Sequence, residues 1–247
     1  MTAEPMTPQG VLPLVTEAAR AAVAPEGAPG WFTTQVEDGV ALRTVARRWS
    51  QAAEPPARLA RTAGGAALYA ARIALAAHGR RAVVTTPGTP GLIAVVRPGV
   101  AAAPRPAERA AYAVLRHGPH PTVRLRPRAV VPHVRRAAEA EGAWLGVVEL
   151  RPGATLGPHW RTDREPVGES VTVLLDVPGE SPWVEVQAGQ AIQAVVLTAG
   201  AAGLHAAVLA APADPAVLRR RLTGPGAAVC GRTVAVLVVG DPVPRRD

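Results

Sequence analysis

Apolar residues recur along the chain with two different periods, and these periods predict alternating helices and strands. Helices are expected where apolar residues return every three or four positions, and strands where they alternate or form short runs between Gly and Pro. The expected helices are residues 9–24, 58–78, 106–115, 132–141, 182–202 and 214–222. The expected strands are residues 32–36, 40–45, 82–86, 92–97, 144–150, 171–175, 206–209 and 234–239. This mixture predicts an α+β fold.

Two of the expected helices are long and mostly apolar. From Ala63 onward, the helix at residues 58–78 has Arg72 as its only charged residue, and Gly79 follows it as a natural C-terminal cap. The helix at residues 182–202 begins after Ser181, a residue type that caps helix N-termini. Because a helix that is apolar all round is normally buried, both helices are expected in the core.

The two long helices are related by an internal repeat. A shift of 124 residues places Gly65 on Gly189 and Gly79 on Gly203, and in both copies an apolar helix ends at Gly before a strand. A duplicated unit that cannot bury its apolar helix alone is expected to pack against its copy around a pseudo-two-fold axis. The repeat therefore predicts two related halves, residues 1–115 and 116–247, that form one compact unit around the paired helices.

The positive net charge of the chain is only weak evidence for a nucleic-acid partner. The 247 residues carry a formal charge of +8, but all 27 basic residues are Arg and the chain has no Lys or Asn, a bias typical of a GC-rich genome. The Arg residues are scattered and no aromatic platform is interleaved with them, so a solvated basic surface is favoured over a nucleic-acid site. With 48% hydrophobic and 19% charged residues, the chain is expected to be globular and not disordered.

The remaining composition excludes several classes of protein. A single cysteine, Cys230, excludes a disulfide framework and a cysteine-based zinc site. The N-terminus, with Glu4 and two prolines in its first eight residues, does not have the pattern of a signal peptide. The apolar stretch at residues 191–212 is interrupted by polar and Gly residues, which favours a core helix and strand over a membrane span. A cytoplasmic protein without a membrane partner is expected.

Several short segments resemble a known family. They are residues 63–68 (Ala-Gly-Gly-Ala-Ala-Leu), 131–143, 188–192 (Ala-Gly-Gln-Ala-Ile) and 234–242. With the order of the elements, they resemble the flavin-dependent nitroreductases, in particular the Acg-type actinobacterial branch, in which one chain carries two nitroreductase-like halves in place of a homodimer. The resemblance covers about residues 12–242. It implies a nitroreductase-like fold with an antiparallel-rich central sheet flanked by helices.

The first chemical motif of that family is partly retained. The family has a flavin-contacting loop of the form A-P-S-x-H-N-x-Q-P-W, and residues 24–31 here keep its Ala-Pro and its Trp. The resemblance therefore implies cofactor contacts from Pro25 and Trp31. The Ser, Asn and Gln of the motif are missing, and Glu26 adds a carboxylate that would repel a phosphate. The alternative for Trp31 is a core anchor under the expected hairpin.

A second motif, R-H-T-x-R-R-P-F, is matched at residues 116–123 only by its first two positions, Arg116 and His117. The resemblance implies that both lie near the cofactor. The alternative for Arg116 is a favourable interaction with the C-terminal end of its own helix. His117 and His120 form an H-x-x-H pair, but Pro119 argues against a helix that would aim both at one metal, so no metal site is expected.

The function implied by the resemblance is that of an FMN-binding oxidoreductase that takes hydride from NAD(P)H and reduces a small acceptor. No catalytic residue is assigned. The loop at residues 85–88 is a further candidate to approach the flavin ring, and the polar segment at residues 151–168 is expected to be a loop or lid. The alternative is a degenerate pseudoenzyme that sequesters flavin or acts as a non-catalytic interaction subunit. A basic binding module is supported by the charge alone, and a homodimer is left open.

Overall fold

The fold is known from a computed structural model, which describes residues 8–25, 30–50, 55–86, 88–119, 122, 124–150, 160–161, 167–210, 222–223 and 232–241. Its helices are α1 (Pro8–Arg20), the 3-10 helix η1 (Arg47–Ser50), α2 (Pro55–Ala77), α3 (Pro106–His117), α4 (Pro127–Ala140) and α5 (Pro182–Ala201). Its strands are β1 (Ala24–Pro25), β2 (Trp31–Val36), β3 (Gly39–Thr44), β4 (Arg80–Thr85), β5 (Leu92–Ala101), β6 (Trp144–Leu150), β7 (Trp160–Arg161), β8 (Val167–Val177), β9 (His205–Ala210), β10 (Leu222–Thr223) and β11 (Arg232–Asp241).

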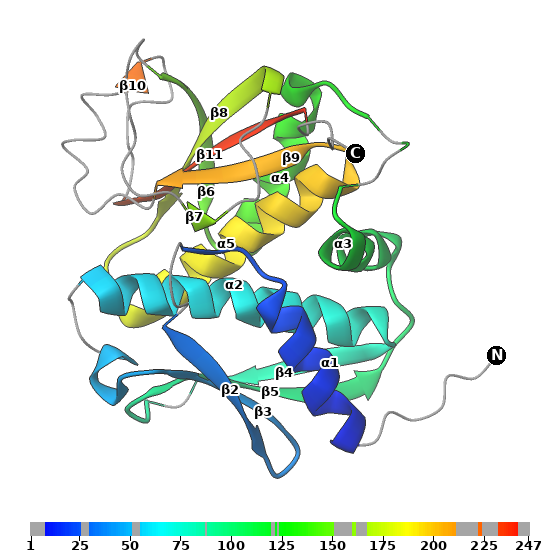
Figure 1. Ribbon diagram of the computed structural model, residues 1–247, viewed down its shortest axis with the longest axis vertical. Helices are drawn as coiled ribbons and strands as arrows, with labels where there is room; N and C mark the ends of the chain where they lie inside the picture. The colour runs from blue at the N-terminus through cyan, green and yellow to red at the C-terminus, as the bar shows by residue number, and fades with distance from the viewer. Residues whose placement is uncertain are drawn as a thin grey trace.

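The strands form two main sheets, and the long helices α2 and α5 lie between them (Figure 1). One sheet has the order β2-β3-β5-β4 and the other the order β10-β6-β8-β11-β9, while β1 and β7 form a separate small pair. All the pairings are antiparallel. The predicted α+β class and antiparallel pairing are confirmed. The single central sheet is wrong, because each long helix covers a sheet of its own and the two helices then pack against each other.

The two main sheets share one topology. In the first, α2 connects the second strand (β3) to β4, and the last strand (β5) lies between β3 and β4. In the second, α5 connects β8 to β9, and β11 lies between them. We call α1, β2, β3, α2, β4 and β5 the first unit, and α4, β6, β8, α5, β9 and β11 the second unit.

The centre of the molecule is the crossing of α2 and α5, the most extensive contact between any two helices. A Cβ atom added to Gly65 would lie 2.0 Å from the carbonyl oxygen of Val186, and one added to Gly189 would lie 1.8 Å from that of Thr62. Thr62 and Val186 are themselves separated by 124 residues. The contacts are therefore reciprocal at the shift that the sequence shows, and neither position has room for a side chain.

Helix α4 differs most from its prediction. It begins at Pro127, five residues before the expected start, so Pro132 lies inside the helix. Pro127 occupies the first turn, where a missing N–H costs nothing. Inside the helix, Pro132 removes one backbone hydrogen bond, and the burial of Val130 and Val134 in the core of the second unit offsets that loss.

Helix α3 lies between the two units and packs on both α2 and α5 (Figure 1). Its buried residues are Ala111, Val114 and Leu115, and Val114 fills the space beside Gly200 of α5. The expected boundary between residues 115 and 116 falls in the last turn of this helix.

Some expected features lie outside the described residues. They include the helix at residues 214–222 except for Leu222 in β10, Cys230, and most of the polar segment at residues 151–168, of which only residues 160–161 and 167–168 are described. Within the described ranges, none of the helices combines the length and hydropathy needed to cross a membrane.

Candidate functional site

A cavity of about 620 Å³ lies at the junction of the two units. The first unit contributes one wall through α2, β4 and the residue after it, and the second unit contributes the opposite wall through the end of α4 and the start of α5. The lining residues are Arg72, Ala82, Val84, Thr86, Glu139, Ala140, Glu141, Gly142, Trp183, Gln187 and Gln190. Thr86 belongs to the loop that the sequence singled out as a candidate to approach a ring.

One face of α5 supplies the groups suited to a planar ligand. Trp183, Gln187 and Gln190 are spaced four and three residues apart, so they lie along one side of the helix. The Trp183 side chain is 39% exposed, which leaves indole surface available for stacking. Ala82 and Val84 of β4 add apolar surface to the cavity.

A polar contact joins three elements at this cavity. Arg72 of α2 donates through Nη1 to Glu141 Oε2 (2.6 Å), which follows α4, and to Gln190 Oε1 (2.7 Å) of α5. Since the oxygen of the Gln190 amide accepts from Arg72, its NH₂ group is the part left to donate. Arg72, an isolated charge on an apolar helix, therefore positions groups of the second unit.

The charges around the cavity are unbalanced toward the negative. Among the described residues, the lining holds one Arg and two Glu, a formal net charge of −1. The C-terminal end of α4 brings the negative end of its helix dipole to the cavity through residues 139–142, and the start of α5 at Trp183 brings the positive end of its own, so the two dipoles oppose each other and the side-chain charges decide the balance. Beside Arg72, burial and the nearby Glu141 raise the pKa of Tyr69 to about 12. The cavity therefore disfavours added negative charge.

The Tyr69 phenol predicts a loss of stability at alkaline pH. In the unfolded chain its pKa returns to about 10, so between about pH 10 and pH 12 the unfolded state loses a proton that the folded state keeps. Stability must then fall as pH rises, by at most about 1.4 kcal/mol per pH unit from this group. Urea unfolding at pH 9 and pH 11 should show a steeper loss for the parent than for Tyr69→Phe, and equal losses would contradict the assignment.

Trp31, Arg116 and His117, which the resemblance implied as flavin contacts, are not among the described residues that line this cavity. Trp31 is 9% exposed, in the apolar core of the first unit with Val15 and Leu42, and its indole N–H has no hydrogen-bond partner among the described residues. Pro25 lies in β1 opposite Trp160 of β7, and residues 26–29 of the same loop lie outside the described residues.

Arg116 and His117 lie at the exposed end of α3. Arg116 forms an ion pair with Glu17 of α1, and both side chains are exposed. Arg116 and His117 are thus exposed, whereas Trp31 is buried in an apolar core. Contact of these residues with a cofactor stays a prediction.

The residues that form the cavity were partly visible in the sequence. The pattern singles out Arg72 as a lone charge, but it marks Trp183 and Gln187 only as part of an apolar helix, and Gln190 only as part of that helix and of the segment 188–192. Their shared helical face was a usable signal. Glu141 could not be found in the same way, because its place beside Arg72 depends on how the two units dock.

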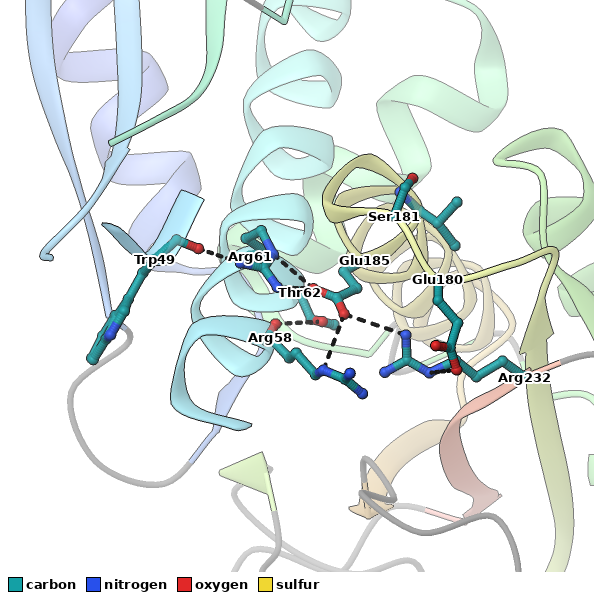
Figure 2. Close-up of polar contacts among 9 residues, drawn as sticks. Trp49, Arg58, Arg61, Thr62, Glu180, Ser181, Glu185 and Arg232 are labelled. Carbon is teal, nitrogen blue, oxygen red and sulfur yellow. Dashed lines mark hydrogen bonds and ion pairs between the residues drawn. The ribbon is translucent and has the colours of Figure 1, made fainter. Parts of the chain in front are cut away.

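A second polar cluster joins the units at the start of α5 (Figure 2), and its residues are not among the described lining of the cavity. Glu185, which is buried, accepts a hydrogen bond from Arg61 Nε (2.7 Å) and lies near Arg58 Nε (3.6 Å) and Arg232 Nη1 (3.3 Å). Arg61 also donates to the Trp49 carbonyl oxygen. Arg61 and Glu185 are 124 residues apart, so they occupy corresponding positions in the internal repeat.

No protein-family model matches the chain, and no curated protein is significantly similar to it. Among the described residues, no group of three or more His, Cys, Asp or Glu side chains is placed to hold a metal ion. The family and the function of the protein are therefore matters for proposal from its own residues.

Proposed function

We propose that the protein is a single-chain pseudo-dimer of two nitroreductase-like halves. Three observations support a duplication: the common strand order of the two main sheets, the 124-residue repeat of the long helices, and the reciprocal contacts of Gly65 and Gly189. Gly65 contacts Val186, and at the 124-residue shift their counterparts Gly189 and Thr62 contact each other. Reciprocal contacts of this kind are typical of a two-fold interface.

The function that the geometry supports best is binding of a planar heteroaromatic ligand of the flavin type in the cavity between the units. The proposal rests on Trp183, Gln187 and Gln190, which place an aromatic surface and two side-chain amides on one wall. Amides at the edge and an apolar surface are what a flavin ring requires. The volume, about 620 Å³, lies within the range usual for small-molecule sites.

The lining fits the ring of FMN better than its phosphate. A phosphate requires Arg side chains or free backbone N–H groups, and the one Arg among the described lining residues, Arg72, is paired through Nη1 with Glu141 and Gln190. Within the proposal, binding or sequestration of flavin by a degenerate member of the fold is therefore favoured over turnover.

A second candidate function is FMN-dependent reduction of a small acceptor by NAD(P)H, in the cytoplasm. It is favoured by the retained Pro25, Trp31, Arg116 and His117 of the family motifs and by the same amides and Trp183 of the cavity. A bound flavin would supply the hydride-accepting ring. Mixing the flavin-loaded protein with NADPH or NADH and following flavin bleaching tests this candidate, and absence of bleaching with both would exclude it.

Ligand binding is tested by titrating the purified protein with riboflavin and following quenching of flavin fluorescence. Trp183→Ala should weaken binding about tenfold, since stacking of one ring on an aromatic side chain contributes about 1–3 kcal/mol. Trp144→Ala is the matched control, because Trp144 is 50% exposed on β6 and does not line the cavity. Equal affinities of the two variants would exclude this cavity as the site.

A further inference from the structure

We propose that the cavity selects a flavin without its phosphate, such as riboflavin, over FMN. This inference rests on the proposed function and identifies its ligand class. The nitroreductase cofactor FMN carries a dianionic phosphate, whereas the described residues of the lining have a formal charge of −1, and the inference starts from this disagreement.

The first step concerns the only cation in the described lining. Arg72 Nη1 is shared between Glu141 Oε2 and Gln190 Oε1, and the Glu141 side chain is only 11% exposed. The remaining N–H groups of the guanidinium can still donate, but a phosphate held by them would lie beside the Glu141 carboxylate, which already neutralises Arg72. Moving Arg72 away from Glu141 to relieve that repulsion would leave a largely buried carboxylate unpaired, which is costly.

The second step concerns the backbone of α4. Helix N-termini bind anions, whereas residues 139–142 form a C-terminal end. The N–H groups of Glu141 and Gly142 donate to the carbonyl oxygens of Ala138 and Glu139 (both 3.0 Å). These N–H groups are therefore already hydrogen-bonded within the turn and are not free to bind a phosphate.

The third step concerns the N-terminus of α5, which meets the cavity at Trp183. Pro182 has no N–H, the Val184 N–H donates to Ser181 Oγ (3.2 Å), and the Glu185 N–H donates to the Ser181 carbonyl oxygen (3.3 Å). At most the amide of Trp183 remains from the first turn. Neither helix end offers the set of free N–H groups that binds a phosphate.

The neutral part of the flavin meets none of these obstacles. Its ring presents hydrogen-bonding edges to the Gln187 and Gln190 amides, and its ribityl hydroxyls accept from or donate to a polar wall without bringing charge. Glu139, on the exposed side of α4, and Glu141 thus act as specificity-determining residues, because they lower the affinity for the phosphorylated ligand and leave the affinity for the ring nearly unchanged.

The experiment compares riboflavin and FMN in fluorescence titrations of the full chain at physiological ionic strength, where the Debye length is about 8 Å and the distant Arg residues are screened. We expect riboflavin to bind about tenfold more tightly than FMN, the size of about 1.4 kcal/mol of charge repulsion. In Glu139→Gln/Glu141→Gln the preference should disappear, mainly through tighter FMN binding. Glu169→Gln, an exposed position outside the lining, should keep the preference of the parent.

The possible failures separate the two proposals. FMN binding as tightly as riboflavin or more tightly, with the Trp183→Ala effect intact, would overturn the selectivity and leave the flavin site standing. If Glu169→Gln also lost the preference for riboflavin over FMN, the preference would come from the net charge of the protein and not from the cavity lining. That result would also overturn the inference. A folded parent protein that binds neither flavin would overturn the proposed function itself.

Discussion

Replacing Gly189 by Ala should destabilise the protein by roughly 3 kcal/mol or more, the upper part of the range for overpacking. The new methyl group would lie 1.8 Å from the Thr62 carbonyl oxygen and 2.8 Å from the Ala66 nitrogen. Both are backbone atoms of α2, so no side-chain rotation relieves the clash and the helices must separate. Gly65→Ala should behave alike, because its Cβ would lie 2.0 Å from the Val186 carbonyl oxygen.

The control for these variants is the neighbouring Gly64→Ala. The three atoms nearest to its Cβ would all belong to the Ile93 side chain, with the terminal Cδ1 atom at 2.4 Å, and that side chain can move. Ala also gains about 1 kcal/mol of helix propensity over Gly in a helix interior. Urea midpoints within about 1 kcal/mol of the parent are therefore expected for Gly64→Ala. If Gly65→Ala and Gly189→Ala also melt like the parent, the close crossing of α2 and α5 is wrong.

Replacing Glu185 by Leu should cost about 3–5 kcal/mol, because it leaves the buried Arg61 without its carboxylate. The Arg61 and Glu185 side chains are only 4% and 6% exposed, and they join α2 to α5 (Figure 2). Arg61→Met should cost a similar amount. The double variant should lose less stability than the sum of the two single variants, because apolar groups then replace both members of the buried pair. Arg232, which also contacts Glu185, still has Glu180 at 3.9 Å as a partner.

A double-mutant cycle by urea unfolding measures this coupling. The comparison pair is Arg97 and Asp38, whose side chains are 34% and 63% exposed, and there a coupling below about 1 kcal/mol is expected. Additive effects of Arg61→Met and Glu185→Leu would show that the pair does not link the units. Since the two positions correspond in the repeat, two copies of the same half would place like charges opposite each other, and the pair thus favours pairing of unlike halves.

Periodicity alone predicted most of the elements, because local patterns of apolar residues decide which segments become helices or strands. The start of α4 was missed because Pro132 matched a helix start, whereas Pro127 and the buried Val130 begin the helix earlier. The candidate site was predicted poorly. The resemblance pointed to Trp31, which the fold buries in the first core, and to Arg116, which pairs with Glu17.

The sequence by itself determined the α+β class, the two apolar helices and the spacing of 124 residues between Gly65 and Gly189. These follow from residue types at fixed separations, which act through local backbone preference and burial. Only the tertiary structure decided that the strands form two sheets, that Arg61 meets Glu185, and that Arg72, Glu141 and Gln190 converge on one cavity. Those contacts depend on the angle and register at which the long helices cross, and in this protein two Gly residues with no room for a side chain fix both.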